Sequence, residues 1–101
     1  MITIEDIISY SKPHPASGAE GGRQTVIGND KIQFSIIGGS RGLYGDFIDT
    51  FEVAIFDTET GEFRTQFFHP DAGDDVIAYM SKNDVENLVN KLIKNKDFQV
   101  R

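Results

Sequence analysis

A chain of 101 residues has room for one hydrophobic core, and we expect residues 1–101 to form a single domain. A hydrophobic content of 39%, with eight Phe, excludes a disordered chain, and the absence of cysteine excludes disulfide bridges, thiolate catalysis and cysteine-ligated zinc. No apolar run approaches the roughly 18 residues of a membrane span, and the first residues lack the features of a signal peptide, so we expect a cytoplasmic protein that does not bind membranes.

The first predicted element is a short helix from Ile4 to about Tyr10. Thr3 is a suitable N-cap, because its side-chain oxygen can accept a backbone N–H of the first turn, and isoleucines at helical spacing give the helix one apolar stripe. Residues 11–22 contain two Pro, three Gly and two Ser. Since proline ends helices and glycine favours irregular backbone, we expect this segment to be a mobile loop.

Alternation of apolar and polar residues predicts a β-hairpin next. Its strands are Gln24–Ile27 and Lys31–Ile37, and Gly28–Asp30 forms the turn. Ile32, Phe34 and Ile36 alternate with polar residues, so they should face the core. A second glycine-rich loop, 38–45, follows this hairpin.

The longest predicted strand is Phe47–Asp57, with Phe51, Val53 and Ile55 on one face. A turn at Thr58–Gly61 would lead into a returning strand over Glu62–Phe68. This is the clearest hairpin pattern in the sequence. A loop over residues 69–75 and a short strand over Val76–Met80 complete the predicted sheet.

The strongest periodic signal belongs to a helix near the C-terminus. Ser81 is its predicted N-cap, with Asp84 in the first turn. Its apolar positions fall at i, i+3, i+4, i+7 and i+8: Val85, Leu88, Val89, Leu92 and Ile93. Residues 97–101 would be a tail or a short edge strand. The sequence therefore predicts an α+β domain, in which an antiparallel sheet of about four to five strands has this helix packed on one face and a short helix at its N-terminus.

The net charge of −6 is distributed unevenly. Residues 1–42 carry four acids and four bases, and residues 76–101 carry three acids and five bases, whereas residues 43–75 carry nine acids and Arg64 alone. Such a segment repels nucleic acid and favours a basic protein partner. We therefore predict an acidic interaction surface within residues 43–75, formed by Asp46, Asp49, Glu52, Asp57, Glu59 and Glu62.

The glycine loop gives a second candidate site. Gly38–Gly42 formally matches the nucleophile elbow G-x-S-x-G, but a strand rather than a helix follows it and the chain is too short for an α/β-hydrolase. Backbone N–H groups and Arg41 could instead bind an anion or another small ligand, although no helix N-terminus follows as in phosphate loops. Arg41 and Tyr44 are the residue types most often found at binding hot spots, so we also predict them to be interaction residues.

A weaker candidate is a metal cluster of one histidine and three aspartates: His69, Asp71, Asp74 and Asp75. Their spacing fits neither an EF-hand nor a zinc motif, and a solvated acidic turn is the simpler interpretation. Glu59 and Glu62 flank one turn without a predicted pocket, so no acid–base pair can be assigned. The sequence thus predicts a protein that is not an enzyme and that needs no cofactor or metal.

The segment from Thr50 to Asp57, the Thr-Gly turn and the Val76–Met80 strand before the C-terminal helix resemble small uncharacterised proteins of bacteriophages and prophages. The resemblance covers about residues 30–93. It implies a phage accessory protein or an inhibitor of a host protein, acting in the host cytoplasm. Self-association as a homodimer is compatible with this interpretation.

Overall fold

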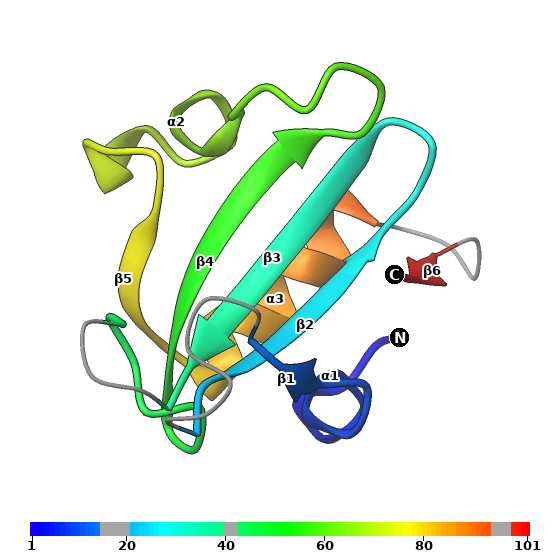
Figure 1. Ribbon diagram of the computed structural model, residues 1–101. Helices are drawn as coiled ribbons and strands as arrows, with labels where there is room; N and C mark the ends of the chain where they lie inside the picture. Colours follow the sequence, from blue (N-terminus) through cyan, green and yellow to red (C-terminus); the bar gives the residue numbers. More distant parts are fainter. Residues whose placement is uncertain (15–20, 40–42, 94–97) are drawn as a thin grey trace.

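The computed structural model describes residues 1–14, 21–39, 43–93 and 98–101 (Figure 1). The expected α+β class and the two expected helices are confirmed. The elements in chain order are α1 (Ile4–Ser9), β1 (Lys12–Pro13), β2 (Arg23–Gly28), β3 (Ile32–Gly38), β4 (Thr50–Asp57), α2 (Thr65–Phe68), the 3-10 turn η2 (Pro70–Ala72), β5 (Ile77–Ser81), α3 (Lys82–Leu92) and β6 (Gln99–Val100).

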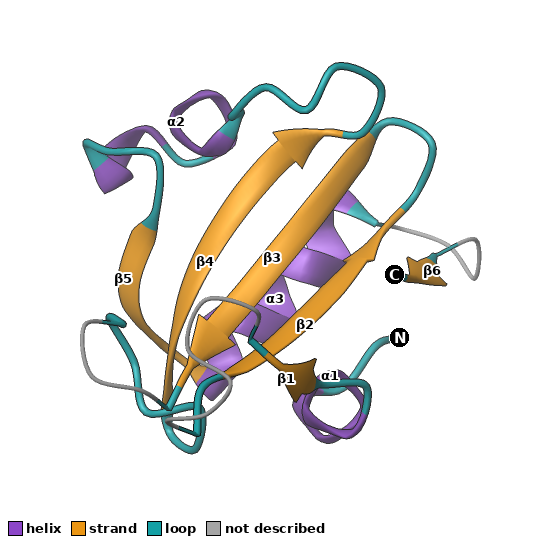
Figure 2. Ribbon diagram, in the orientation of Figure 1, coloured by secondary structure: helices purple, strands orange, loops and turns teal. Residues whose placement is uncertain are grey.

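The strands form one antiparallel sheet in the order β1-β2-β3-β4-β5, and β6 pairs with the end of β2 (Figure 2). Residues close in sequence therefore pair with each other along most of the sheet. The register of the central strands places Phe34 opposite Ile55 and Ile36 opposite Val53. Strand β5 forms one edge, and its pairing with β4 is interrupted by a bulge between Phe51 and Val53.

Helix α3 packs across one face of this sheet (Figure 2). Of the predicted core-facing residues of the two long strands, Ile32 is partly buried and the others are fully buried: Phe34, Ile36, Phe51, Val53 and Ile55. They share one core with the stripe of α3, of which Val85, Leu88, Val89 and Ile93 are buried and Leu92 is partly buried. The period-two and period-3.6 patterns thus identified the two surfaces that meet in the core.

Both predicted helix caps are present. Thr3 accepts the N–H of Asp6, whose carboxylate accepts the N–H of Thr3 in return, a complete capping box. Ser81 accepts the N–H of Asp84 and so ends β5 where α3 begins. Helix α1 docks on α3 because the side chains of Asn90 and Glu86 accept the backbone N–H groups of Ile2 and Ile4.

The predicted strand Glu62–Phe68 is wrong. After the turn at residues 58–61 the chain makes a single bridge, Phe63 to Phe56, and then forms helix α2. A longer strand has no partner to pair with, because β3 and β5 occupy the two sides of β4. Thr65 takes the place of a strand neighbour: its hydroxyl accepts the N–H of Ile55 at 2.9 Å and donates to the carbonyl of Asp75 at 2.6 Å.

Two other boundaries differ from prediction. Strand β4 starts at Thr50 rather than Phe47, because Phe47 has a left-handed φ of 59° within a turn that ends at Thr50. The segment 11–22 is not a loop throughout, since Lys12 and Pro13 pair with β2 and the N–H of His14 donates to Gly22. The expected mobility of this segment concerns mainly residues 15–20, which lie outside the described residues.

Candidate functional site

The predicted acidic residues lie at the two ends of β4 rather than on one face. Asp46 and Asp49 precede the strand, whereas Asp57, Glu59 and Glu62 lie at or beyond its last residue. Seven residue steps of an extended strand separate these ends by about 23 Å. The two groups are therefore separate surfaces, and each needs its own description.

At the start of β4, Asp46 organises the turn that leads into the strand. Its Oδ1 atom accepts the backbone N–H groups of Ile48, Asp49 and Thr50 at 2.8, 2.8 and 3.0 Å. These bonds, that from Thr50 first, lower the pKa of the Asp46 carboxyl from 3.8 to about 2, because they stabilise its charged form. Although Asp46 is on the surface, its carboxylate is already used by the protein's own backbone.

Its two neighbours at this end are also engaged. Glu52 accepts the backbone N–H of Tyr44 at 3.0 Å and holds the preceding loop against the strand. Asp49 forms an exposed ion pair with Lys82 of α3, with Nζ and Oδ1 3.6 Å apart. An exposed pair of this kind contributes little stability, but it offsets the charge of Asp49.

The opposite end of the sheet collects seven acidic residues, which we call the acidic end: Asp30, Asp57, Glu59, Glu62, Asp71, Asp74 and Asp75. They come from the β2–β3 turn and from the segment between β4 and β5, which lie together at the top of Figure 1. Thr58 connects the two turns, because its hydroxyl donates to the carbonyl of Asn29 and its N–H to that of Lys31. Lys31 and Arg64 are the formal positive charges in these two stretches.

Three of these acids have local structural roles. Asp57 accepts the N–H groups of Thr60 and Glu59, each at 2.9 Å. These bonds, that from Thr60 first, together with nearby Arg64, lower the pKa of its carboxyl. Glu62 pairs with Arg64 at 3.2 Å, and Asp74 accepts the N–H of Asp75. The carboxylates of the other four, Asp30, Glu59, Asp71 and Asp75, make no side-chain hydrogen bond or ion pair with another described residue and are exposed.

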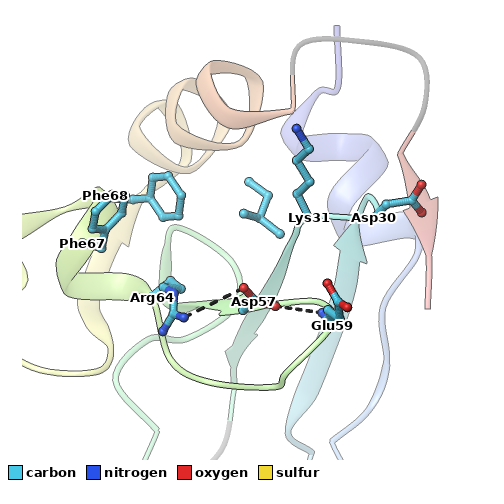
Figure 3. A pocket seen from close by; sticks show the side chains of 8 residues that line it. Asp30, Lys31, Asp57, Glu59, Arg64, Phe67 and Phe68 are labelled. Carbon is cyan, nitrogen blue, oxygen red and sulfur yellow. Dashed lines mark hydrogen bonds and ion pairs between the residues drawn. The ribbon is translucent and has the colours of Figure 1, made fainter.

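A pocket of about 340 Å³ opens between the two turns (Figure 3). Asp30 and Lys31 line it from the β2–β3 turn, Glu59 and Arg64 from the segment after β4, and Phe67 and Phe68 from α2. The ring of Phe67 is 76% exposed, and that of Phe63 nearby in sequence is 47% exposed. Free carboxylates beside exposed aromatic rings can bind a basic residue together with an apolar one.

Among the described residues, neither carboxyl with a perturbed pKa suits the role of a general acid. The buried polar side chains are Thr25 and Thr65, and both are satisfied by backbone partners. The carboxyls with a perturbed pKa are that of Asp46, an exposed turn residue, and that of Asp57, a half-exposed residue at the end of β4, and in both the pKa is lowered rather than raised. Neither has the raised pKa that a general acid needs near neutral pH.

The weak metal candidates do not converge. His69, Asp71, Asp74 and Asp75 lie in and around the turn η2, and the described part of the chain contains no group of three or more His, Cys, Asp or Glu able to hold a metal ion. Asp71 and Asp75 instead contribute charge to the acidic end.

In the glycine loop, Arg41 lies outside the described residues, so its predicted role stays a prediction. Gly38 and Gly45 have a packing role: a Cβ on Gly38 would lie 2.8 Å from the backbone N of Phe47, and one on Gly45 would lie 2.8 Å from backbone atoms at the start of β4. The N–H of Gly39 donates to the carbonyl of Gly45 and is therefore not available to an anion in this arrangement. Tyr44 is 49% exposed and packs edge-on against Tyr79.

Sequence reasoning missed four exposed residues at these surfaces. Asp30 lies in a stretch whose charges balance, and Phe63 and Phe67 lie within the predicted strand Glu62–Phe68. The sequence around Tyr79 does not indicate that this side chain is exposed, because its exposure depends on the bulge in β5. The Thr-Gln-Phe-Phe sequence after Arg64 has no alternation, which was a local sign that the predicted strand ends there.

No family model, curated protein or solved structure matches the chain. The resemblance to small phage proteins therefore stays a prediction. None of the described helices is long and apolar enough to cross a membrane. A functional proposal must accordingly rest on the chemistry of the surfaces described above.

Proposed function

We propose that the protein is a non-enzymatic interaction module that binds a basic segment of a partner protein through its acidic end. The observation that carries the proposal is a pocket lined by three acids and two aromatic rings (Asp30, Asp57, Glu59, Phe67 and Phe68), at an end of the sheet where four further acids lie. A partner with lysine or arginine beside an apolar residue would complement both features.

The availability of the carboxylates supports this choice of surface. Asp30, Glu59, Asp71 and Asp75 are exposed and have no side-chain partner among the described residues, so a ligand can pair with them without breaking native contacts. At the other end, Asp46 and Glu52 accept backbone N–H groups, and Asp49 pairs with Lys82. Of the two groups of predicted interaction residues, the group around Glu59 is thus the better candidate.

The exposed aromatic rings add the apolar part of the contact. Phe67 exposes 76% of its surface, and aromatic residues at interface centres contribute strongly to binding. Electrostatic attraction would mainly accelerate association, while burial of the Phe67 ring would slow dissociation. The roles of phage accessory protein and host inhibitor are consistent with such a module and stay predictions.

A titration with defined peptides tests the proposal. The isotope-labelled protein is mixed with the peptide Gly-Lys-Leu-Lys-Gly-Lys-Leu-Lys-Gly, and backbone amide shifts are followed by NMR. We expect shifts concentrated at residues 29–31 and 57–75, and several-fold weaker binding when NaCl is raised from about 50 mM to about 500 mM. The matched peptide with glutamate in place of lysine should not bind.

Two double variants with the same net charge show whether peptide binding depends on the acids of the acidic end or on the net charge of the whole protein. Glu59→Gln with Asp71→Asn should weaken binding of the lysine peptide, whereas Glu5→Gln with Asp49→Asn should leave it nearly unchanged. Equal weakening by both pairs would show that only net charge matters. That result, or salt-independent binding, would contradict the proposal.

A further inference from the structure

A second cavity lies along the exposed edge of the sheet, between β5 and α3. Its volume is about 400 Å³, and its apolar walls are Ile77 and Met80 of the strand and Leu88 of the helix. Strand β5 is the last strand of the sheet among the described residues, and it forms the left edge of the sheet in Figure 1. The cavity is therefore open along the edge of the sheet rather than closed by a further strand.

The helix side of this groove has a regular charge pattern. Asp84, Leu88 and Lys91 line it at positions i, i+4 and i+7, which place them on one face of α3. Asp84 and Lys91 are exposed, and neither side chain makes an ion pair or hydrogen bond with another described residue. The groove thus presents a negative group, an apolar wall and a positive group in a line.

The strand side does not offer a regular ladder to an added strand. The bulge leaves Glu52 of β4 opposite two residues of β5, and Tyr79 within it has a left-handed φ of 53°. The N–H of Tyr79 already donates to the carbonyl of Tyr44 at 2.9 Å. Because the bulge distorts β5 and the Tyr79 N–H is already hydrogen-bonded, an added strand cannot pair regularly with β5. A ligand here must therefore be recognised mainly by its side chains.

We propose that this groove binds an extended segment of a partner protein in which alternate residues are basic, apolar and acidic. The rise of an α-helix places Leu88 about 6 Å and Lys91 about 10.5 Å from Asp84 along the axis. In an extended chain, residues i, i+2 and i+4 lie on one side at about 6.6 and 13 Å. A basic residue at position i of the ligand therefore lies beside Asp84 when an apolar residue at i+2 packs against Leu88. The acidic residue at i+4 lies slightly beyond Lys91, and the long lysine side chain can reach it.

This proposal does not depend on the proposed function. The acidic end would attract any basic segment, whereas the groove has one charge of each sign and requires both signs in its ligand. Apart from His69, which lines the groove but lies within the range of the acidic end, the residues are also different: the other groove residues fall within 77–91, and the acidic end involves residues 29–31 and 57–75. Amide shifts can therefore assign each peptide to one surface.

The test uses three peptides with glycine at both ends: Lys-Thr-Leu-Thr-Glu, Lys-Thr-Leu-Thr-Lys and Glu-Thr-Leu-Thr-Glu. NMR titration should show shifts at residues 77–80 and 84–91, with the mixed-charge peptide binding about two- to fivefold more tightly there than either other peptide, the range of one exposed ion pair. Replacing leucine by serine in that peptide should abolish the shifts.

Lys91→Glu is the decisive variant, because it should change the order of the three peptide affinities so that the peptide with two lysines binds the groove most tightly. Lys82→Glu makes the same charge change on the same helix outside the groove, and it should leave the order unchanged. The amide spectra of both variants show whether each is folded. The proposal is overturned if no groove amide shifts at millimolar peptide, if the shifts fall only at the acidic end, or if Lys91→Glu leaves the order of the peptides as it was.

Discussion

The two ends of β4 carry similar acidic turns but use them differently. At the start of the strand, Asp46 accepts three backbone N–H groups and Glu52 accepts a fourth, so the carboxylates hold the chain in place. At the end of the strand Asp57 accepts two backbone N–H groups and Asp74 accepts one, while Glu59 is exposed and lines a pocket with Phe67. Charge in a sequence therefore shows where acids are, but only hydrogen bonding shows which are available to a partner.

The largest expected effect comes from the residue that anchors the acidic end. Thr65→Val removes a hydroxyl that is fully buried and bonded to Ile55 and Asp75. Because the N–H of Ile55 would be left without its acceptor, we expect the free energy of unfolding to fall by about 2–3 kcal/mol, measured by urea denaturation. Thr60→Val, at an exposed hydroxyl 3.2 Å from the N–H of Glu62, is the control and should cost much less.

The next largest loss of stability should distinguish the two ends of β4 directly. Asp46→Ala removes the acceptor of three backbone N–H groups, whereas Glu59→Ala removes a carboxylate with no partner among the described residues. We expect a clear loss of stability for the first and almost none for the second in thermal unfolding. Equal losses would show that the two ends do not differ as described.

The dependence of stability on pH should report the hydrogen bonds of Asp46. The pKa of Asp46 is lowered from 3.8 to about 2 in the folded protein, so the unfolded chain binds the proton more readily. The contribution of Asp46 is therefore complete above its unfolded value and is lost as the pH falls from about 4 to about 2. Asp46→Asn should flatten this part of the pH–stability curve, measured as the free energy of unfolding by urea denaturation at a series of pH values.

The smallest effect on stability is expected at Phe67. Since its ring is 76% exposed, Phe67→Ser should change the free energy of unfolding by no more than about 0.5 kcal/mol. The same change should weaken binding of the lysine–leucine peptide at the acidic end and leave the groove beside β5 unaffected. A large loss of stability instead would mean that the ring has a packing role.

Local sequence patterns were sufficient to predict the helices and strands whose neighbours in the fold also lie nearby in the sequence. The alternation of Phe34 with Ile36 and the stripe from Val85 to Ile93 predicted two buried surfaces, and Thr3 and Ser81 predicted helix starts. Each of these signals depends on contacts within one turn or one strand. The central strands and the helix that covers them could therefore be predicted from the residues alone.

The segment after β4 could not be predicted in the same way. Residues 62–68 contain aromatic residues that suit a strand, but β5 occupies the side of β4 where that strand would pair. Competition between two segments for one strand edge is decided by the whole fold. The exposure of Phe63 and Phe67, and with it the candidate binding surface, follows from that competition.

The sequence by itself determined the α+β class, the caps, the main core residues and the excess of acids between residues 43 and 75. Only the tertiary structure decided that these acids divide between two ends of a strand, that Asp30 joins one of them, and that Asp84 and Lys91 flank a groove at the sheet edge. The physical reason is that periodicity and capping are local properties. The hydrogen-bond partner of a carboxylate and the neighbour of a strand edge depend on segments far apart in the chain.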